Sequence, residues 1–205
     1  MNAQSINADN TAALVEVLRG SGIGIMPTDT VYGLVCRAHD EAACERLYAA
    51  KHRQHKPGTV IAASLEQLTD LGLKRAYLKA DEQFWPNPIS VIVPCGEELS
   101  YLHMGKRSLA VRVPKDEALL SLLEQTGPLL TTSANLPGEP VATSVQEAKG
   151  YFGDTADFYA DGGTITDHKP STVIRIVDDA IEVLRLGAVT IDENGRITKN
   201  HESIF

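Results

Sequence analysis

The sequence predicts an α/β protein in which helices flank one twisted sheet of parallel and antiparallel strands. Segments with helical periodicity mix with short β-branched apolar runs along most of the chain. The 205 residues, 43% of them hydrophobic and 22% charged, are enough to bury one core. Glycine and proline are scattered and form no linker, so we expect a single domain over residues 1–205, with 1–10 as a flexible start.

Helices are predicted where apolar residues recur three or four positions apart. Gly20 ends the first of them, and Pro57 with Gly58 limits the second. Ser64 and Gln67 have the spacing of a capping box at the start of the third. The expected helices are 11–19, 40–53, 64–71, 76–84, 117–125 and a short one after Ser144.

Strands are predicted at short apolar runs rich in β-branched residues. Asp178 and Asp179 separate two such runs and so predict a hairpin. Pro27 cannot easily continue a central strand, and residues 27–30 therefore belong to a loop at a strand end, where ligands often bind in α/β folds. The expected strands are 23–26, 59–63, 89–93, 109–113, 129–132, 172–177 and 181–186.

Composition narrows the class of protein. A net charge of −8 argues against general coating of nucleic acid, although a local basic pocket is compatible with it. Cys36, Cys44 and Cys95 share no CxxC spacing, which predicts reduced thiols and no structural zinc. The first residues lack a signal-peptide pattern and no apolar run reaches membrane-spanning length, so we expect a cytoplasmic protein without a membrane partner.

The glycine-rich phosphate loop of many nucleotide-binding proteins is missing. Gly105 and Lys106 are adjacent, but Ser100 stands where GxxxxGK[ST] requires its first glycine and Arg107 where it requires Ser or Thr. Side-chain cations would therefore have to bind any nucleotide.

Lys51 and Arg53 are the best candidates for such cations. Residues two apart on a helix point to nearly opposite sides, so these two can converge on one ligand only if the backbone leaves the helix between them. Pro57 and Gly58 just downstream favour that exit. The alternative is that both cations merely complement the dipole at the helix C-terminus.

Ser133 and Asn135 offer a hydroxyl and an amide on the same side of an extended segment. Such a pair can bind a phosphate oxygen or a ribose. The alternative is an ordinary turn before Pro137.

Arg112 lies inside the apolar run 109–113, where an arginine is rarely buried without an anionic partner or ligand. Its planar guanidinium suits a carboxylate, so an amino acid is a natural ligand, and an outward-facing arginine at the rim is the alternative. Residues 28–30 together with Tyr32 add a dense set of donors and acceptors, which could equally be a cap between strand and loop.

Six fragments, in this order, carry a family resemblance: PTDTVYGL at 27–34, KHR at 51–53, SLAVRVP at 108–114, TSAN at 132–135, PST at 170–172 and RLG at 185–187. Together they resemble the threonylcarbamoyl-AMP synthase family in its short, YrdC-like form. The resemblance runs over about 15–188 and implies the YrdC-like mixed sheet with a concave, positively charged cleft.

The resemblance also implies roles for individual residues. The catalytic set would be Lys51, Arg53, Ser133 and Asn135. These four would bind ATP together with Ser108 and Arg185. The threonine pocket would be lined by Thr30, Tyr32, Arg112, Thr131 and Ser171. Four departures from the family pattern, Gln54, Thr59, Asn87 and Pro137, remove none of the charged residues.

The implied activity is that of a nucleotidyltransferase, which converts ATP, L-threonine and bicarbonate or CO₂ into L-threonylcarbamoyladenylate and pyrophosphate. Mg²⁺ would arrive with ATP and not in a protein metal site. The product would pass to a tRNA threonylcarbamoyl-transferase complex that modifies the adenosine next to the anticodon, so direct tRNA binding is not required. The alternatives are an RNA-binding or regulatory member of the superfamily without synthase activity, and a carbamoyl-transfer module like that of hydrogenase-maturation proteins.

Overall fold

The computed structural model describes residues 3–52, 56–166, 168–192 and 194–199. Its α-helices are α1 (Thr11–Arg19), α2 (Glu41–Ala50), α3 (Leu65–Asp70), α4 (Arg75–Asp81), α5 (Ser100–His103), α6 (Glu117–Thr126) and α7 (Val145–Phe152). Short 3₁₀ turns lie at Glu82–Phe84, Glu97–Leu99 and Gly153–Thr155. Among the residues described, no helix combines the length and the apolar character needed to cross a membrane.

Side-chain caps fix where most of these helices begin. Asn10, Asp40, Ser64, Asp116 and Ser144 each accept a hydrogen bond from the backbone N–H three residues later. Such caps satisfy a backbone donor that has no partner within the helix. The predicted helix starts at 11, 64 and 144 are therefore confirmed.

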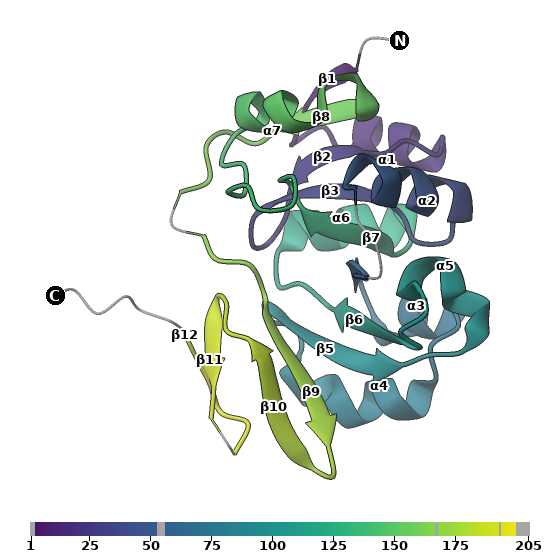
Figure 1. Cartoon of the computed structure of the whole chain (residues 1–205), viewed down its shortest axis with the longest axis vertical. Coiled ribbons are helices and arrows are strands. Elements are labelled where there is room, and N and C mark those ends of the chain that lie inside the picture. The colour runs from purple at the N-terminus through teal and green to yellow at the C-terminus, as the bar shows by residue number, and fades with distance from the viewer. Residues whose placement is uncertain (1–2, 53–55, 167, 193, 200–205) are drawn as a thin grey trace, which may run out of the picture.

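The strands are β1 (Gln4–Asn7), β2 (Gly24–Pro27), β3 (Tyr32–Arg37), β4 (Thr59–Ile61), β5 (Ile89–Pro94), β6 (Ser108–Arg112), β7 (Leu129–Ser133), β8 (Phe158–Asp161), β9 (Thr172–Val177), β10 (Ala180–Arg185), β11 (Val189–Ile191) and β12 (Ile197–Lys199). The first ten form one sheet in the order β1-β8-β2-β3-β7-β4-β6-β5-β9-β10, and β11 pairs separately with β12 (Figure 1). Parallel and antiparallel pairs both occur, as in β4 with β6 and β3 with β7. The predicted α/β class with a mixed sheet is confirmed.

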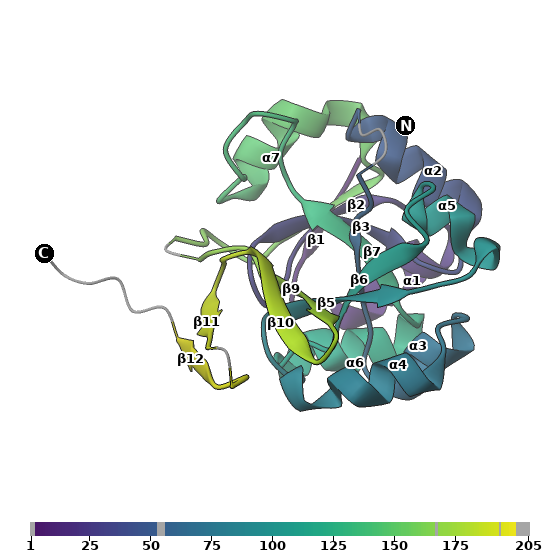
Figure 2. The same cartoon turned by 60° about the horizontal axis from the view of Figure 1, so that its bottom comes forward.

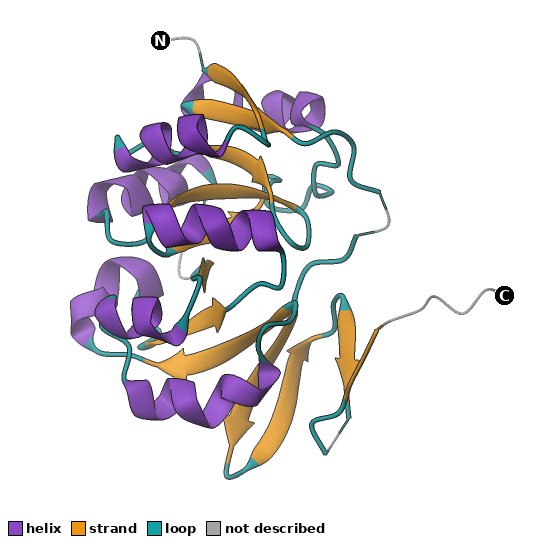
Figure 3. Cartoon of the chain, turned by 180° about the vertical axis from the view of Figure 1, so that it is seen from behind, coloured by secondary structure: helices purple, strands orange, loops and turns teal. Residues whose placement is uncertain are grey.

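Helices cover both faces of the sheet. Figure 2 shows α3, α4 and α6 along one side and α2, α5 and α7 along the other. The core contains one large apolar cluster and a smaller one, and α1 and α6 supply the helical side chains of the smaller. Figure 3 shows the long connection that joins β8, near one end of the sheet, to β9, near the other.

Five of the described strands were not among those predicted: β1, β3, β8, β11 and β12. Residues 4–7, expected in a flexible start, instead form β1, which pairs in parallel with β8, and that expectation is wrong for this segment. β1 has no recognisable strand pattern in the sequence, because Ile6 is the one buried residue in it. Acidic residues surround β8 in the sequence and obscure its apolar pattern. β3 begins only a few residues after β2 ends, so the sequence pattern does not separate the two strands.

The hairpin predicted at 172–177 and 181–186 is confirmed as β9 and β10. Asp178 and Asp179 have φ angles of 50° and 62°. Two positive φ values in a two-residue turn match the right-handed twist of the flanking strands. The hairpin places Arg185, at its far end, beside Ser171 at its entry.

Candidate functional site

One face of the central sheet carries a cavity of about 400 Å³. The strand register places Gly33 opposite Ser133, Thr131 opposite Thr59 and Thr59 opposite Ala110, and all five residues line the cavity. Paired residues share a face of a sheet, and these side chains are small, so the face stays hollow. Gly33 is required here, because a Cβ atom would lie 2.6 Å from Oγ1 of Thr131.

The structure brings together most of the residues that the sequence singles out. Around the cavity they come from the loop after β2, from β6 and β7, and from both ends of the β9–β10 hairpin. Those that line it are Thr30, Arg112, Thr131, Ser133, Ser171 and Arg185. With Lys56, which also lines it, the described residues of the wall include three cationic side chains. The expected concave, positively charged cleft therefore has a counterpart in this cavity.

The loop after β2 is held by Thr28. Its hydroxyl donates to the carbonyl of Val31 over 2.7 Å and accepts from the backbone N–H groups of Thr30 and Val31. The cap between strand and loop, which the sequence left as an alternative, thus describes Thr28. Thr30 lines the cavity, and its carbonyl lies 2.9 Å from Nδ1 of His168.

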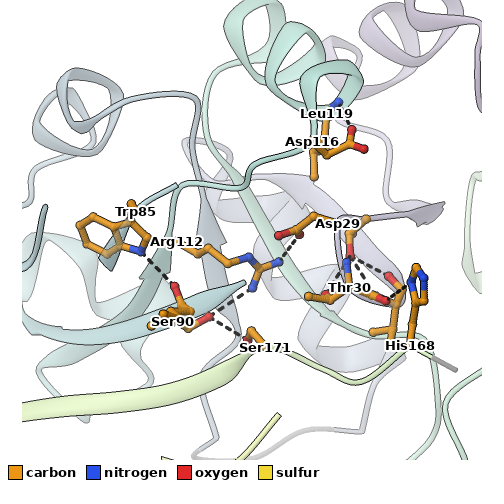
Figure 4. A network of polar contacts seen from close by, with 12 residues as sticks. Asp29, Thr30, Trp85, Ser90, Arg112, Asp116, Leu119, His168 and Ser171 are labelled. Atoms are coloured by element: carbon orange, nitrogen blue, oxygen red, sulfur yellow. Dashed lines mark hydrogen bonds and ion pairs between the residues drawn. The ribbon is translucent and has the colours of Figure 1, made fainter. Parts of the chain in front are cut away.

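Arg112 is buried, with 3% of its surface exposed. Its Nη2 donates to Oδ1 of Asp29 over 2.8 Å, and its Nη1 donates to Oγ of Ser90 over 3.2 Å (Figure 4). Nε of Arg112 and Oδ2 of Asp29 have no hydrogen-bond partner among the residues described. The prediction of a buried arginine with an anionic partner is confirmed, and the rim alternative is wrong.

Arg185 binds the entry of β9. Its Nε and Nη2 donate to the carbonyl of Ser171 over 3.1 and 2.8 Å, and Nη2 also reaches Oγ of Ser171 at 3.1 Å. These bonds hold Ser171 against the cavity that both residues line. The hairpin thus supplies a cation and a hydroxyl to the same wall.

Lys51 is the last residue of the α2 turn, and the chain leaves the helix directly after it, because His52 has a φ of 50°. The predicted exit from the helix is confirmed. The Lys51 ammonium is buried and donates to the carbonyls of Ser133 and Asn135 and to Oδ1 of Asn135. Arg53, the other predicted cation, lies outside the described residues.

Ser133 and Asn135 form one cluster with Lys51. Oγ of Ser133 donates to Oδ1 of Asn135 over 2.7 Å, and Nδ2 of Asn135 donates to the carbonyl of Glu139 over 2.6 Å. The cluster is therefore a turn braced by hydrogen bonds, which agrees with the alternative of a turn before Pro137. It also presents Ser133 to the cavity.

Four of the predicted site residues that the structure describes do not line the cavity: Lys51 and Asn135, which brace the turn at Ser133, and Tyr32 and Ser108. Tyr32 is fully buried, and its hydroxyl donates to the carbonyl of Gly163 and accepts from the N–H of Gly162, so it fastens the connection between β8 and β9. Burial raises the pKa of Tyr32, which keeps the phenol protonated. Ser108 begins β6 and is not among the described residues that line the cavity.

Sequence reasoning missed Lys56, Asp29 as the partner of Arg112, and Ser90. Lys56 belongs to the basic segment 51–56, and its charge was a usable signal. Ser90 interrupts the apolar run 89–93, which is a weak signal, because serine is common in strands that have one polar face.

Residues 16–187 match the sequence family named for Sua5, YciO and YrdC, which is described as "Telomere recombination". The chain belongs to this family. The threonylcarbamoyl-AMP synthase of Klebsiella pneumoniae is 34% identical over 176 residues, which cover 82% of this chain and 92% of that protein. The threonylcarbamoyl-AMP synthase of Bacillus subtilis is 31% identical over 92% of this chain but only 56% of its own length.

A solved structure of Pyrococcus abyssi Sua5 complexed with L-threonine has the same fold. The two superpose with a TM-score of 0.81 at 29% identity, over 92% of this chain and 59% of that one. This chain therefore corresponds to somewhat more than half of the P. abyssi protein.

Proposed function

We propose that this protein is a threonylcarbamoyl-AMP synthase, a nucleotidyltransferase that makes L-threonylcarbamoyladenylate and pyrophosphate from L-threonine, bicarbonate or CO₂, and ATP. The observation that carries the proposal is the pairing of two arginines on one cavity wall. Arg112 and Arg185 both line the cavity and are linked through Ser90 and Ser171. One arginine suits a carboxylate and the other a phosphate, so the cavity can hold an amino acid beside a nucleotide.

The threonine end of the cavity centres on Arg112. Its two terminal nitrogens each use one N–H on the protein, so each keeps a second N–H for a ligand carboxylate. The hydroxyls of Thr30 and Thr131 line the same cavity and offer partners to the ammonium and hydroxyl groups of threonine. A pocket of this kind separates threonine from serine by only about 1–3 kcal/mol, because the two differ by one methyl group.

The nucleotide end is assigned to Arg185, Lys56 and the turn braced by Lys51. Two of these cations face the cavity, and Ser133, whose hydroxyl donates to Oδ1 of Asn135, lines the same wall. Arg53 is a further predicted phosphate ligand. The Lys51 ammonium donates hydrogen bonds to oxygens of Ser133 and Asn135, which supports a role in shaping this wall.

The chemistry requires positioning more than a strong base. The amine of threonine adds to CO₂ and loses a proton, which forms the carbamate N–C bond. A carbamate oxygen then attacks the α-phosphorus of ATP, the new P–O bond forms, and the bond from that phosphorus to the bridging oxygen breaks to release pyrophosphate. Because the nucleophile is already anionic, the arginines and lysines act by orienting the two reactants and stabilising negative charge on the phosphates.

Mg²⁺ is proposed as a companion of ATP. Within the described part of the chain, no group of three or more His, Cys, Asp or Glu side chains is placed to hold a metal ion. Bound to the phosphates, Mg²⁺ would neutralise part of their charge. The product is a reactive mixed anhydride, so we propose that it passes to a separate transferase acting on tRNA.

Pyrophosphate release by the purified protein tests the proposal. We expect release with ATP, Mg²⁺, bicarbonate and L-threonine together and none when threonine or bicarbonate is omitted. Arg112→Ala should abolish it, and Lys79→Ala should not, because Lys79 forms only an exposed ion pair with Glu82. If ATP and threonine bind but no pyrophosphate appears, the protein is instead a binding or regulatory member of the family.

A further inference from the structure

A chain of hydrogen bonds connects the two arginines of the cavity through two serines. Nη1 of Arg112 donates to Oγ of Ser90, Oγ of Ser90 lies 2.9 Å from Oγ of Ser171, and Nη2 of Arg185 donates to Oγ of Ser171 (Figure 4 shows the first two links). Ser90 lies in β5, on the same face as Ile92, which lines the cavity. Neither the sequence nor the family resemblance singles Ser90 out.

The direction of the bond between the serines follows from counting hydrogens. A serine hydroxyl has one hydrogen to donate and two lone pairs to accept with. Ser90 is fully buried, and one lone pair accepts from Arg112. Among the residues described, the only acceptor within hydrogen-bond distance of its hydroxyl is Oγ of Ser171. Since buried polar groups almost always find a partner, Ser90 donates to Ser171.

The opposite direction is disfavoured. If Ser171 donated to Ser90, the Ser90 hydroxyl would accept twice and its own hydrogen would be buried without an acceptor. An unmade hydrogen bond of that kind is costly. The protein avoids this cost by using Ser90 as the donor.

Ser171 is thereby left as a donor toward the cavity. Its oxygen accepts from Ser90 and from Nη2 of Arg185, so both lone pairs are occupied. Its own hydrogen has no acceptor among the described residues, and Ser171 lines the cavity. Arg112 beside it can only donate. The two residues thus form a subsite of donors alone, which suits a carboxylate and rejects a carboxamide.

We propose that Ser90 is a positioning residue for amino-acid recognition: it orients Arg112 and sets Ser171 as a hydrogen-bond donor to the carboxylate of L-threonine. The inference rests on the proposed function, since it takes threonine as the ligand of this subsite. Ser90 itself touches no substrate. Its action passes through its neighbours on β6 and β9.

The first test compares Ser90→Thr with Ser90→Val. These side chains have nearly the same shape, so any steric effect of the added bulk is shared, and only threonine keeps the hydroxyl. We expect the KM for L-threonine to be about ten-fold or more higher in Ser90→Val than in Ser90→Thr. The KM for ATP should differ between them by less than about three-fold, because the link to Arg185 also includes the carbonyl of Ser171. Equal threonine KM values in the two variants would overturn the proposal.

A second test uses the unaltered protein and so does not depend on the variants folding. L-Threoninamide and the methyl ester of L-threonine both lack the carboxylate charge, but the amide carries N–H donors and the ester only acceptors. A subsite of donors should bind the ester at least about ten-fold more tightly as a competitor of threonine. An amide that competes as well as the ester would show that Ser171 accepts, and the proposal would be wrong.

The two proposals fail in different ways. Wild-type protein that shows no saturable dependence on threonine would refute the synthase, and with it the ligand of this subsite. Wild-type protein that synthesises the adenylate normally, while Ser90→Val matches Ser90→Thr, would leave the synthase intact and refute only the role of Ser90.

Discussion

Lys51 and Arg112 are both buried cations at the candidate site, but the protein meets their charges differently. The ammonium of Lys51 has three N–H donors, and three oxygens of Ser133 and Asn135 accept from it. Arg112 has five N–H donors and, among the described residues, uses two of them, on Asp29 and Ser90. The contrast indicates that Lys51 organises the site, whereas Arg112 keeps donors for a ligand.

The largest effect is expected for Lys51→Ala, which tests the first half of the contrast. Oδ1 of Asn135 would keep the Ser133 hydroxyl as a donor, and the Ser133 carbonyl would keep the N–H of Asn135. The Asn135 carbonyl would lose the Lys51 ammonium, so we expect the free energy of unfolding to fall by about 1–3 kcal/mol. Activity should fall by about 100-fold or more, because the turn that presents Ser133 loosens. Urea denaturation and pyrophosphate release measure the two losses. Unchanged stability with lost activity would mean that Lys51 acts only on the phosphates.

Arg112→Lys tests the second half. Lysine keeps the positive charge but loses the planar fork, so it cannot satisfy Asp29, Ser90 and a ligand carboxylate together. We expect the KM for L-threonine to rise by about 30-fold while the KM for ATP changes little. Initial rates at varied threonine and at varied ATP separate the two. A comparable rise in both would place Arg112 outside threonine recognition.

Asp81 sharpens the comparison, because burial alone accounts for the shifted pKa of its carboxyl group. The residue is only 6% exposed, and burial raises the pKa of its carboxyl group to about 6. The folded pKa lies above the unfolded value, so the folded state binds the proton more tightly, and stability falls as the pH rises from about 4 to 6. Asp81→Asn should therefore raise the free energy of unfolding at pH 7 by about 2 kcal/mol and flatten this pH dependence.

Denaturant titrations of wild type and Asp81→Asn between pH 4 and pH 8 measure this difference, with pyrophosphate release as the control for the site. The two curves should converge toward pH 4 and separate by pH 6. Parallel curves over the whole range would show that Asp81 titrates normally.

The sequence located the local features well and the long-range ones poorly. The helix at 11–19 has the predicted bounds, because its apolar spacing, its cap at Asn10 and its stop at Gly20 are all local. The burial of Arg112 could be expected, since an arginine within an apolar run is an anomaly. The partners of Arg112 could not be predicted, because Asp29 and Ser90 belong to other elements and lie 83 and 22 residues away in the sequence. β1 and β8 were missed for the same reason, because pairing between segments far apart in the sequence leaves no local signal.

A change at Tyr32 has the smallest expected effect. It distinguishes the role that the family resemblance implies for this residue from the role that its contacts in the structure indicate. The family resemblance places it at the threonine pocket, whereas the structure uses its hydroxyl to hold Gly162 and Gly163. Tyr32→Phe removes that hydroxyl without changing the ring and leaves one backbone N–H and one carbonyl short of a partner. We expect the free energy of unfolding to fall by about 1–2 kcal/mol and the KM for threonine to stay within about two-fold of wild type. Thermal unfolding and initial rates measure both quantities. A large rise in the threonine KM at unchanged stability would return Tyr32 to the threonine pocket and would mean that Arg112 shares recognition with a side chain that this structure buries.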